Sequence, residues 1–307
     1  MNNIRISTMP LQPFNFYLFN VDHGQSAAAR LPNGQWCIFD VGRSTTFSPV
    51  QFIIDNDMRS RSKEPPWSKR PPWLLARARP FLFLKATISH LHGDHIDDYL
   101  NLFAASPQFL KTVDMDGEYL ADALSTSANE SFSKILDFVQ RYQRHKRIST
   151  PEPNLPNYGL AKVREKSLPV AIARKIGGQA NSRVNNASII TRIDCYRTSI
   201  LICGDMEEEA WEFALNHVPY SFIWRPFVSN IDILIAPHHG HSYSHTLMHL
   251  ANPDTVLVSI VSKDESLDTR YEKKVTTRSK GHIHLSIAPN PPFSSREKGK
   301  RNWYTWR

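Results

Sequence analysis

Three histidines and one aspartate lie close together in the first third of the chain. They fall within seven consecutive positions that follow an apolar stretch directly: Ser89-His90-Leu91-His92-Gly93-Asp94-His95. Imidazole and carboxylate groups are the ligands that borderline divalent metals such as zinc prefer. His90 and His92 can share one side of an extended segment, because successive side chains of a strand alternate. Asp94 and His95 can turn toward a second ion beyond the flexible Gly93.

This spacing predicts a site for two metal ions. The alternative is that an aspartate before a helix acts as its cap, and that the histidines carry no chemistry. Capping explains Asp94 but not the three histidines around it. We therefore favour metal binding by the whole group: His90, His92, Asp94 and His95. Asp94 is also a candidate catalytic residue.

Two later segments carry the same residue types after apolar stretches. Asp205 follows an expected strand through Gly204, and His238 and His239 follow another through a proline. Helix capping would explain Asp205 if it stood alone, and a polar loop would explain the two histidines. Beside the first cluster, metal roles are the better interpretation. We favour His238 as the ligand, with His239 as a supporting or substrate-facing catalytic group.

Periodicity predicts the elements that position these residues. Strands are expected where aromatic, β-branched and other apolar residues cluster, at 14–21, 26–31, 35–41, 81–88, 170–176, 188–194, 198–203, 231–236 and 256–261. Helices are expected at 48–58, 97–105 and 130–144, with a further helix starting at 206–209. Two β-rich halves flanked by helices predict an α/β fold, a four-layered αββα sandwich. We expect one domain over residues 1–288, followed by a basic tail at 289–307.

A basic, proline-rich insertion interrupts this domain at about 59–80. Residues 59–79 hold seven basic side chains, one acidic side chain, and Trp67 and Trp73. Such a segment could follow a phosphate backbone and stack on bases, so four of its cations are candidate substrate-binding residues: Arg59, Arg61, Lys69 and Arg70. A solvated loop or an arm that docks a protein partner explains the composition equally well.

Composition bounds the class of protein. The chain has 307 residues, 41% of them hydrophobic, and a formal net charge of +8. That charge attracts polyanions without identifying one. Three scattered cysteines do not form a disulfide framework, and the sequence shows no leader and no membrane-spanning stretch. A cytoplasmic protein is therefore expected.

The motifs taken together resemble the metallo-β-lactamase superfamily, and most closely the hydrolase-like domain of the competence protein ComEC. The H-x-H-x-D-H signature is matched at all four fixed positions. The other matching segments occur in the same order along the chain as in the family, three before the signature and three after it: Val21–Ser26, Pro32–Gly34, Ile38–Gly42, Asn186–Ile190, Leu201–Asp205 and Pro237–Gly240. The likeness runs from about residue 14 to residue 262.

The resemblance implies a hydrolase that uses two divalent metal ions, Zn2+ or Mn2+. It makes Asp205 the carboxylate shared between the ions and His238 a ligand of the second ion. Many superfamily members have another metal-binding histidine before the shared aspartate. Here the one histidine in that interval is His145, in a basic run, so water, substrate or Asn186 could fill its position.

A hydroxide between two ions suits attack on a phosphodiester. The leading expectation is therefore a phosphodiesterase or nuclease that acts on nucleic acid or a nucleotide. The same ions could hydrolyse a small acyl, lactone or lactam substrate, because a fold alone does not choose the chemistry. A third alternative is a non-enzymatic scaffold subunit that keeps the fold.

Overall fold

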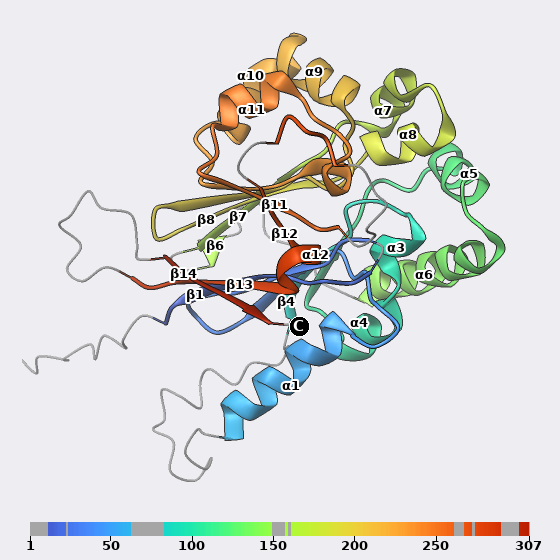
Figure 1. The fold of residues 1–307 in the computed structure, drawn as a ribbon. Coiled ribbons are helices and arrows are strands. Elements are labelled where there is room, and N and C mark those ends of the chain that lie inside the picture. Colours follow the sequence, from blue (N-terminus) through green and yellow to red (C-terminus); the bar gives the residue numbers. More distant parts are fainter. Residues whose placement is uncertain are drawn as a thin grey trace, which may run out of the picture.

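Two β-sheets packed face to face form the centre of the molecule, with helices outside both (Figure 1). The computed structural model describes residues 12–22, 24–62, 83–148, 157–158, 161–260, 267–271, 274–289 and 301–306. Within these ranges each sheet has seven strands. The expected four-layered αββα sandwich is confirmed.

The first sheet combines strands from both ends of the chain, in the order β14-β13-β1-β2-β3-β4-β5. Its strands are β1 (Phe14–Leu18), β2 (Ala27–Arg30), β3 (Trp36–Phe39), β4 (Phe83–Thr87), β5 (Phe109–Lys111), β13 (His282–Ile287) and β14 (Arg301–Trp306). β3, β4 and β5 run parallel, and the other neighbours are antiparallel. The loop after β4 carries the histidine-rich segment.

The second sheet has the order β12-β11-β10-β9-β8-β7-β6. Its strands are β6 (Asn157–Tyr158), β7 (Ala161–Lys166), β8 (Ile190–Cys195), β9 (Thr198–Ile202), β10 (Ile233–Ile235), β11 (Thr255–Val258) and β12 (Lys274–Thr276). The strands from β9 to β12 run parallel, so β9 and β10 end at the same edge. Asp205 and the two adjacent histidines follow these two ends.

Helices cover the outer faces of both sheets. On the first sheet and around the site loops lie α1 (Pro49–Ser62), α3 (Gly93–Ile96), α4 (Tyr99–Ala105), α5 (Gly117–Ser125) and α6 (Asn129–Ile148). The second half contributes α7 (Val170–Gly177), α8 (Ala180–Asn186), α9 (Glu208–Asn216), α10 (Tyr220–Val228), α11 (His245–Ala251), α12 (Thr277–Lys280) and a short 3-10 turn, η2 (Pro237–Gly240). In Figure 1, α9, α10 and α11 cover the second sheet.

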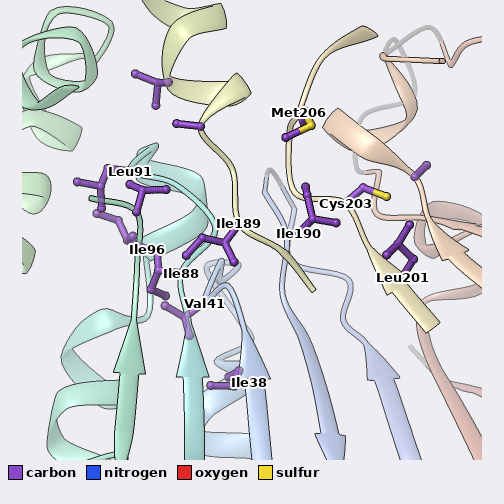
Figure 2. Packing of buried hydrophobic residues seen from close by; sticks show 14 of the residues in the cluster. Ile38, Val41, Ile88, Leu91, Ile96, Ile189, Ile190, Leu201, Cys203 and Met206 are labelled. Carbon is purple, nitrogen blue, oxygen red and sulfur yellow. The ribbon is translucent and has the colours of Figure 1, made fainter. Parts of the chain in front are cut away.

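Alternation along the strands separates an interior between the sheets from the layers under the helices. In β1, Phe14, Phe16 and Leu18 are buried between the sheets, whereas Asn15 and Tyr17 are only partly buried. The apolar cluster under the helices continues into the site loops. Figure 2 shows its members there: Ile38, Val41, Ile88, Leu91, Ile96, Ile189, Ile190, Leu201, Cys203 and Met206. These side chains anchor both ends of the histidine-rich loop.

Two expected elements differ from the structure. The strand expected at 170–176 is wrong, because Val170–Gly177 forms helix α7. Its buried residues, Val170 and Ala173, are three positions apart, which is a helical spacing rather than an alternation. The helix expected at 48–58 continues to Ser62, so the insertion begins inside α1.

The C-terminal residues that the structure describes join the first sheet. Arg301–Trp306 pairs with β13 as β14, so this part of the expected tail belongs to the sheet. The boundary at residue 288 stays a prediction.

The basic insertion is described only in part. Arg59 and Arg61 lie in the last turns of α1, and Lys69 and Arg70 lie outside the described residues. In the part of the chain that the structure covers, we find no helix both long and apolar enough to cross a membrane.

Candidate metal centre

Three loops at one end of the sandwich bring the candidate ligands together. The loop after β4 supplies His90 and His95, the loop after β9 supplies Asp205, and the turn η2 after β10 supplies His239. His90 and His95 have no exposed surface, and Asp205 is 3% exposed. The centre therefore combines one loop of the first sheet with two loops of the second.

The side chains form two overlapping groups with metal-ligand chemistry. One contains His90, His95 and Asp205, and the other contains Asp94, His95 and His239; within each group the ligand atoms lie within 4.8 Å of one another. Asp205 Oδ2 is 3.8 Å from His90 Nε2, 3.4 Å from His95 Nε2 and 3.5 Å from His239 Nε2. Asp205 thus faces a ring nitrogen of each of these three histidines.

Buried polar atoms without partners show that the donor set fits a cation. Among the described residues, four such atoms at the centre have no hydrogen bond: His92 Nε2, His95 Nε2, His239 Nε2 and Asp205 Oδ1. Leaving a buried polar atom unsatisfied costs about 1–3 kcal/mol each. A divalent cation satisfies imidazole nitrogens and carboxylate oxygens together. The residues present therefore fit metal ions of the zinc or manganese type.

Asp40 orients His95 directly and His90 through Ser89. Its Oδ1 accepts a hydrogen bond from the Ser89 N–H (2.6 Å), and its Oδ2 accepts one from the Ser89 hydroxyl (2.8 Å). His95 Nδ1 lies 3.0 Å from the same Oδ2 and therefore donates to it. His90 Nδ1 lies 2.9 Å from Ser89 Oγ. Both rings then present Nε2 to the centre, as metal-binding histidines commonly do.

The second sheet holds its ligands by similar contacts. Ser188 Oγ accepts a hydrogen bond from the Asp205 N–H (3.1 Å) and lies 3.3 Å from His90 Nδ1. His239 Nδ1 lies 3.2 Å from the Ser259 carbonyl oxygen and donates to it, which leaves Nε2 facing the carboxylates. Ser188 therefore holds the backbone at Asp205, and the Ser259 carbonyl holds the His239 ring.

The pKa values follow from burial and from these neighbours. Burial, and next to it the nearby His95, holds the pKa of His90 well below its usual value. For His95, burial acts to lower the pKa, but Asp205, Asp40 and Asp94 together outweigh it and raise the pKa well above the usual value. Burial opposes ionisation of Asp205, yet His95 and His239 lower its pKa far below the normal range. The carboxylates thus create a field that stabilises positive charge.

His238 and His239 point in different directions although they are adjacent. Both have left-handed backbone conformations, with φ values of 48° and 52°. His239 reaches the cluster, whereas His238 Nδ1 is 3.8 Å from Glu207 Oε1 and its side chain is 29% exposed. The geometry thus brings together His239 and the other ligands, in contrast to the preference for His238 drawn from the sequence.

The remaining expected residues lie at different distances from the centre. His92 Nδ1 is 3.0 Å from His90 Nε2, so His92 lies beside the first group. Asn186 is fully buried, and its Oδ1 accepts a hydrogen bond from the Glu207 N–H. His145 lies on α6 and packs near Phe103, away from the described cluster.

Two glycines permit the close approach of the loops. A Cβ on Gly42 would lie 2.5 Å from the Asp94 carbonyl oxygen, and one on Gly24 would lie 2.0 Å from the same atom. Gly24 also has a φ of 105°, a conformation that favours glycine. Gly24 and Gly42 therefore allow their segments to pack against the backbone of the histidine-rich loop.

The supporting residues Asp40, Ser89 and Ser188 were not among the candidates from the sequence. Asp40 and Ser188 lie within segments that carried the family resemblance, at Ile38–Gly42 and Asn186–Ile190. Those segments were the available signal. Their roles depend on contacts across 55 and 98 positions of the chain, which no local pattern reveals.

Comparison with known proteins gives only remote likenesses. No family model matches the chain, and no curated protein matches it. One similar solved structure is a long form of RNase Z from yeast, with a TM-score of 0.42, 10% identity, and coverage of 92% of this chain and 43% of that chain. Another is a mutant of the CmlA β-hydroxylase, with a TM-score of 0.41, 12% identity, and coverage of 82% and 46%. The chain thus spans less than half of either protein, and the particular resemblance to ComEC stays a prediction.

Proposed function

We propose that the chain is a hydrolase dependent on two divalent metal ions, and that it cleaves phosphodiester bonds in nucleic acid or a nucleotide. The observation that carries this proposal is the pair of ligand groups that share His95, with Asp205 in the first group and 3.5 Å from His239 of the second. In the assignment we propose, His90 and His92 would hold one ion, Asp94, His95 and His239 would hold the other, and Asp205 would serve both. His239 takes the ligand role that the sequence favoured for His238.

Two ions bound there would act as Lewis acids and lower the pKa of a coordinated water. The chain's own residues would orient the reaction. Asp40 and Ser89 keep His90 and His95 in the tautomer that frees Nε2. Asp94 is more exposed than its neighbours, with 34% of its side chain accessible, so it faces the approach to the centre. His238 and Glu207 lie next to each other near the centre, and we propose them as candidate substrate contacts.

The net charge of +8 favours a polyanionic substrate over a neutral one. Contact with that substrate through Arg59, Arg61, Lys69 and Arg70 remains a prediction. Neutralising these four residues together should weaken nucleic-acid binding and flatten its salt dependence, because each phosphate contact releases a counterion. If the salt dependence of nucleic-acid binding did not change, the basic insertion would more plausibly be a segment that docks a protein partner.

The direct test is metal content and turnover of the same preparation. Protein loaded with zinc or manganese would be assayed by elemental analysis and against single-stranded DNA, duplex DNA, RNA, cyclic nucleotides and a chromogenic lactam. We expect up to two ions per chain and cleavage of a phosphodiester. Asp98→Asn serves as the control for loss of a buried carboxylate that is not a proposed ligand. Asp98 is buried, and its carboxylate caps α1. Turnover of the lactam alone would favour the acyl-type hydrolase, and protein without bound metal would favour a scaffold.

A further inference from the structure

A buried ion pair joins the two sheets just below the candidate metal centre. Lys85 Nζ of β4 lies 2.7 Å from Glu165 Oε2 of β7, and the two side chains are 1% and 3% exposed. The Thr87 hydroxyl donates to Glu165 Oε1, and Lys111 Nζ lies 3.0 Å from Oε2. β4 belongs to the first sheet and β7 to the second. Glu165 therefore binds side chains across the interior of the sandwich.

The surroundings of this pair are apolar. Lys85 is in register with Cys37 of β3 and Phe109 of β5, and both of these belong to the cluster between the sheets. Buried ions lose their hydration, and apolar residues of similar volume in the place of such a pair often leave a protein equally stable. Stability alone therefore does not account for the pair. For Glu165, burial acts to raise the pKa, but Lys85 and Lys111 outweigh it and lower the pKa, so the carboxylate is ionised.

The pair lies at the end of the sandwich where the ligand loops begin. Thr87 ends β4, and Ser89 follows with its carbonyl accepting a hydrogen bond from the Ile189 N–H of the second half (2.9 Å). β7 reaches the same end, because Lys166, the residue after Glu165, is in register with Ile190. The spacing of the sheets here therefore sets the separation between the ligands of the first sheet and those of the second.

We propose that Lys85 and Glu165 are positioning residues for the metal centre, which hold the two sheets at the spacing that metal coordination requires. The inference rests on the proposed metal site. His90 comes from the first sheet and Asp205 from the second, and their closest atoms are 3.8 Å apart. Metal–ligand distances tolerate changes of only about 0.2 Å. A small change in sheet spacing thus alters coordination before it disturbs the fold.

The test is a double variant, Lys85→Met with Glu165→Leu, which removes both charges and keeps an apolar interior. We expect it to fold, and to bind zinc about tenfold or more weakly in competition with a chromophoric chelator, the size of effect seen for outer supporting groups. The absorption spectrum of the cobalt-loaded protein should change as well, since it reports ligand geometry. Asp194→Asn is the matched control, because Asp194 pairs with Arg164 and Arg192 within the second sheet only.

A milder variant, Thr87→Val, removes one hydrogen bond to Glu165 without leaving a charge unpaired, and serves if the double variant does not fold. It should weaken zinc binding less than the double variant but more than Asp194→Asn. A folded double variant, or Thr87→Val in its place, with wild-type zinc affinity and cobalt spectrum would overturn the inference. Wild-type protein that binds no metal would instead overturn the proposed function on which it rests.

Discussion

Replacing Asp40 by asparagine tests whether the centre is built to hold metal. Asp40 is 1% exposed and accepts three hydrogen bonds, from the Ser89 N–H, the Ser89 hydroxyl and His95 Nδ1. An asparagine retains one acceptor oxygen. If that oxygen keeps the Ser89 N–H, the new amide group faces His95 Nδ1, and two donors cannot bond to each other. The His95 ring then favours the proton on Nε2, the atom that should face the ion.

The size of the effect follows from this tautomer change. Loss of a partner behind a metal-binding histidine weakens metal affinity about 10- to 100-fold, which is about 1.4 to 2.8 kcal/mol at 1.4 kcal/mol per tenfold. The fold should lose about 1–3 kcal/mol of unfolding free energy, because buried bonds to a charged acceptor become neutral or are lost. Zinc titration by calorimetry and urea unfolding of the metal-free protein measure the two quantities separately.

Asp98→Asn is the control for the general cost of removing a buried charge. The Asp98 carboxylate accepts from the Ser48 hydroxyl (2.6 Å) and the Val50 N–H (3.0 Å) at the start of α1, and among the described residues its hydrogen bonds and ion pairs involve no histidine. It should lower stability without changing zinc affinity. If folded Asp40→Asn protein bound zinc as tightly as the wild type, the reasoning from Asp40 to the His95 tautomer would be refuted.

The remaining predictions concern the ligands, the loop packing and pH. Asp94→Ala should abolish turnover while one ion and the fold remain, because the second subsite loses a ligand; wild-type turnover by a folded variant would remove Asp94 from the mechanism. His239→Ala should lower the zinc stoichiometry, whereas His238→Ala should not, as elemental analysis will show. Gly42→Ala should destabilise the protein by about 1–3 kcal/mol, since its Cβ would meet the Asp94 carbonyl oxygen at 2.5 Å; an unchanged melting temperature would contradict this. Burial lowers the pKa of His284 to about 4, so the unfolded chain binds more protons between about pH 4 and 6.5 and stability should fall as pH falls through that window. His284→Gln should flatten this dependence in urea titrations.

Local patterns predicted the elements that carry the site better than the contacts between them. The histidine-rich segment is contiguous, and the stretch before it is mostly apolar apart from Lys85 and Thr87, so both were accessible from the sequence. Which of the adjacent His238 and His239 lies at the cluster was not accessible from the sequence. It depends on two successive left-handed backbone conformations, which turn adjacent side chains in directions that neither strand nor helix periodicity describes.

The segment that became α7 shows a different limit. Val170-Ala171-Ile172-Ala173 is apolar and short, and such runs suit a buried strand as well as a helix. Packing decided the outcome, because Val170 and Ala173 are buried on one side of a helix. The buried Lys85–Glu165 pair could not be predicted from the sequence either. Lysine and glutamate usually lie on the surface, and no local pattern marks these two as buried.

Backbone strain at the centre follows the placement of its side chains. Asp40, His238 and His239 all have positive φ values, between 48° and 54°, in the left-handed region that favours glycine. Each such residue costs on the order of 1–3 kcal/mol, and the surrounding structure must hold it in place. Backbone hydrogen bonds do so, from the Asp40 N–H to the Thr87 carbonyl (2.8 Å) and from the His238 N–H to the Gly204 carbonyl (2.9 Å). Gly204 and Gly240, which lie next to Asp205 and His239 in the sequence, also have positive φ values, of 51° and 81°. Asp40 and His239 therefore hold this conformation at the centre, as residues such as Ser106 and Asn252 do elsewhere among the described residues.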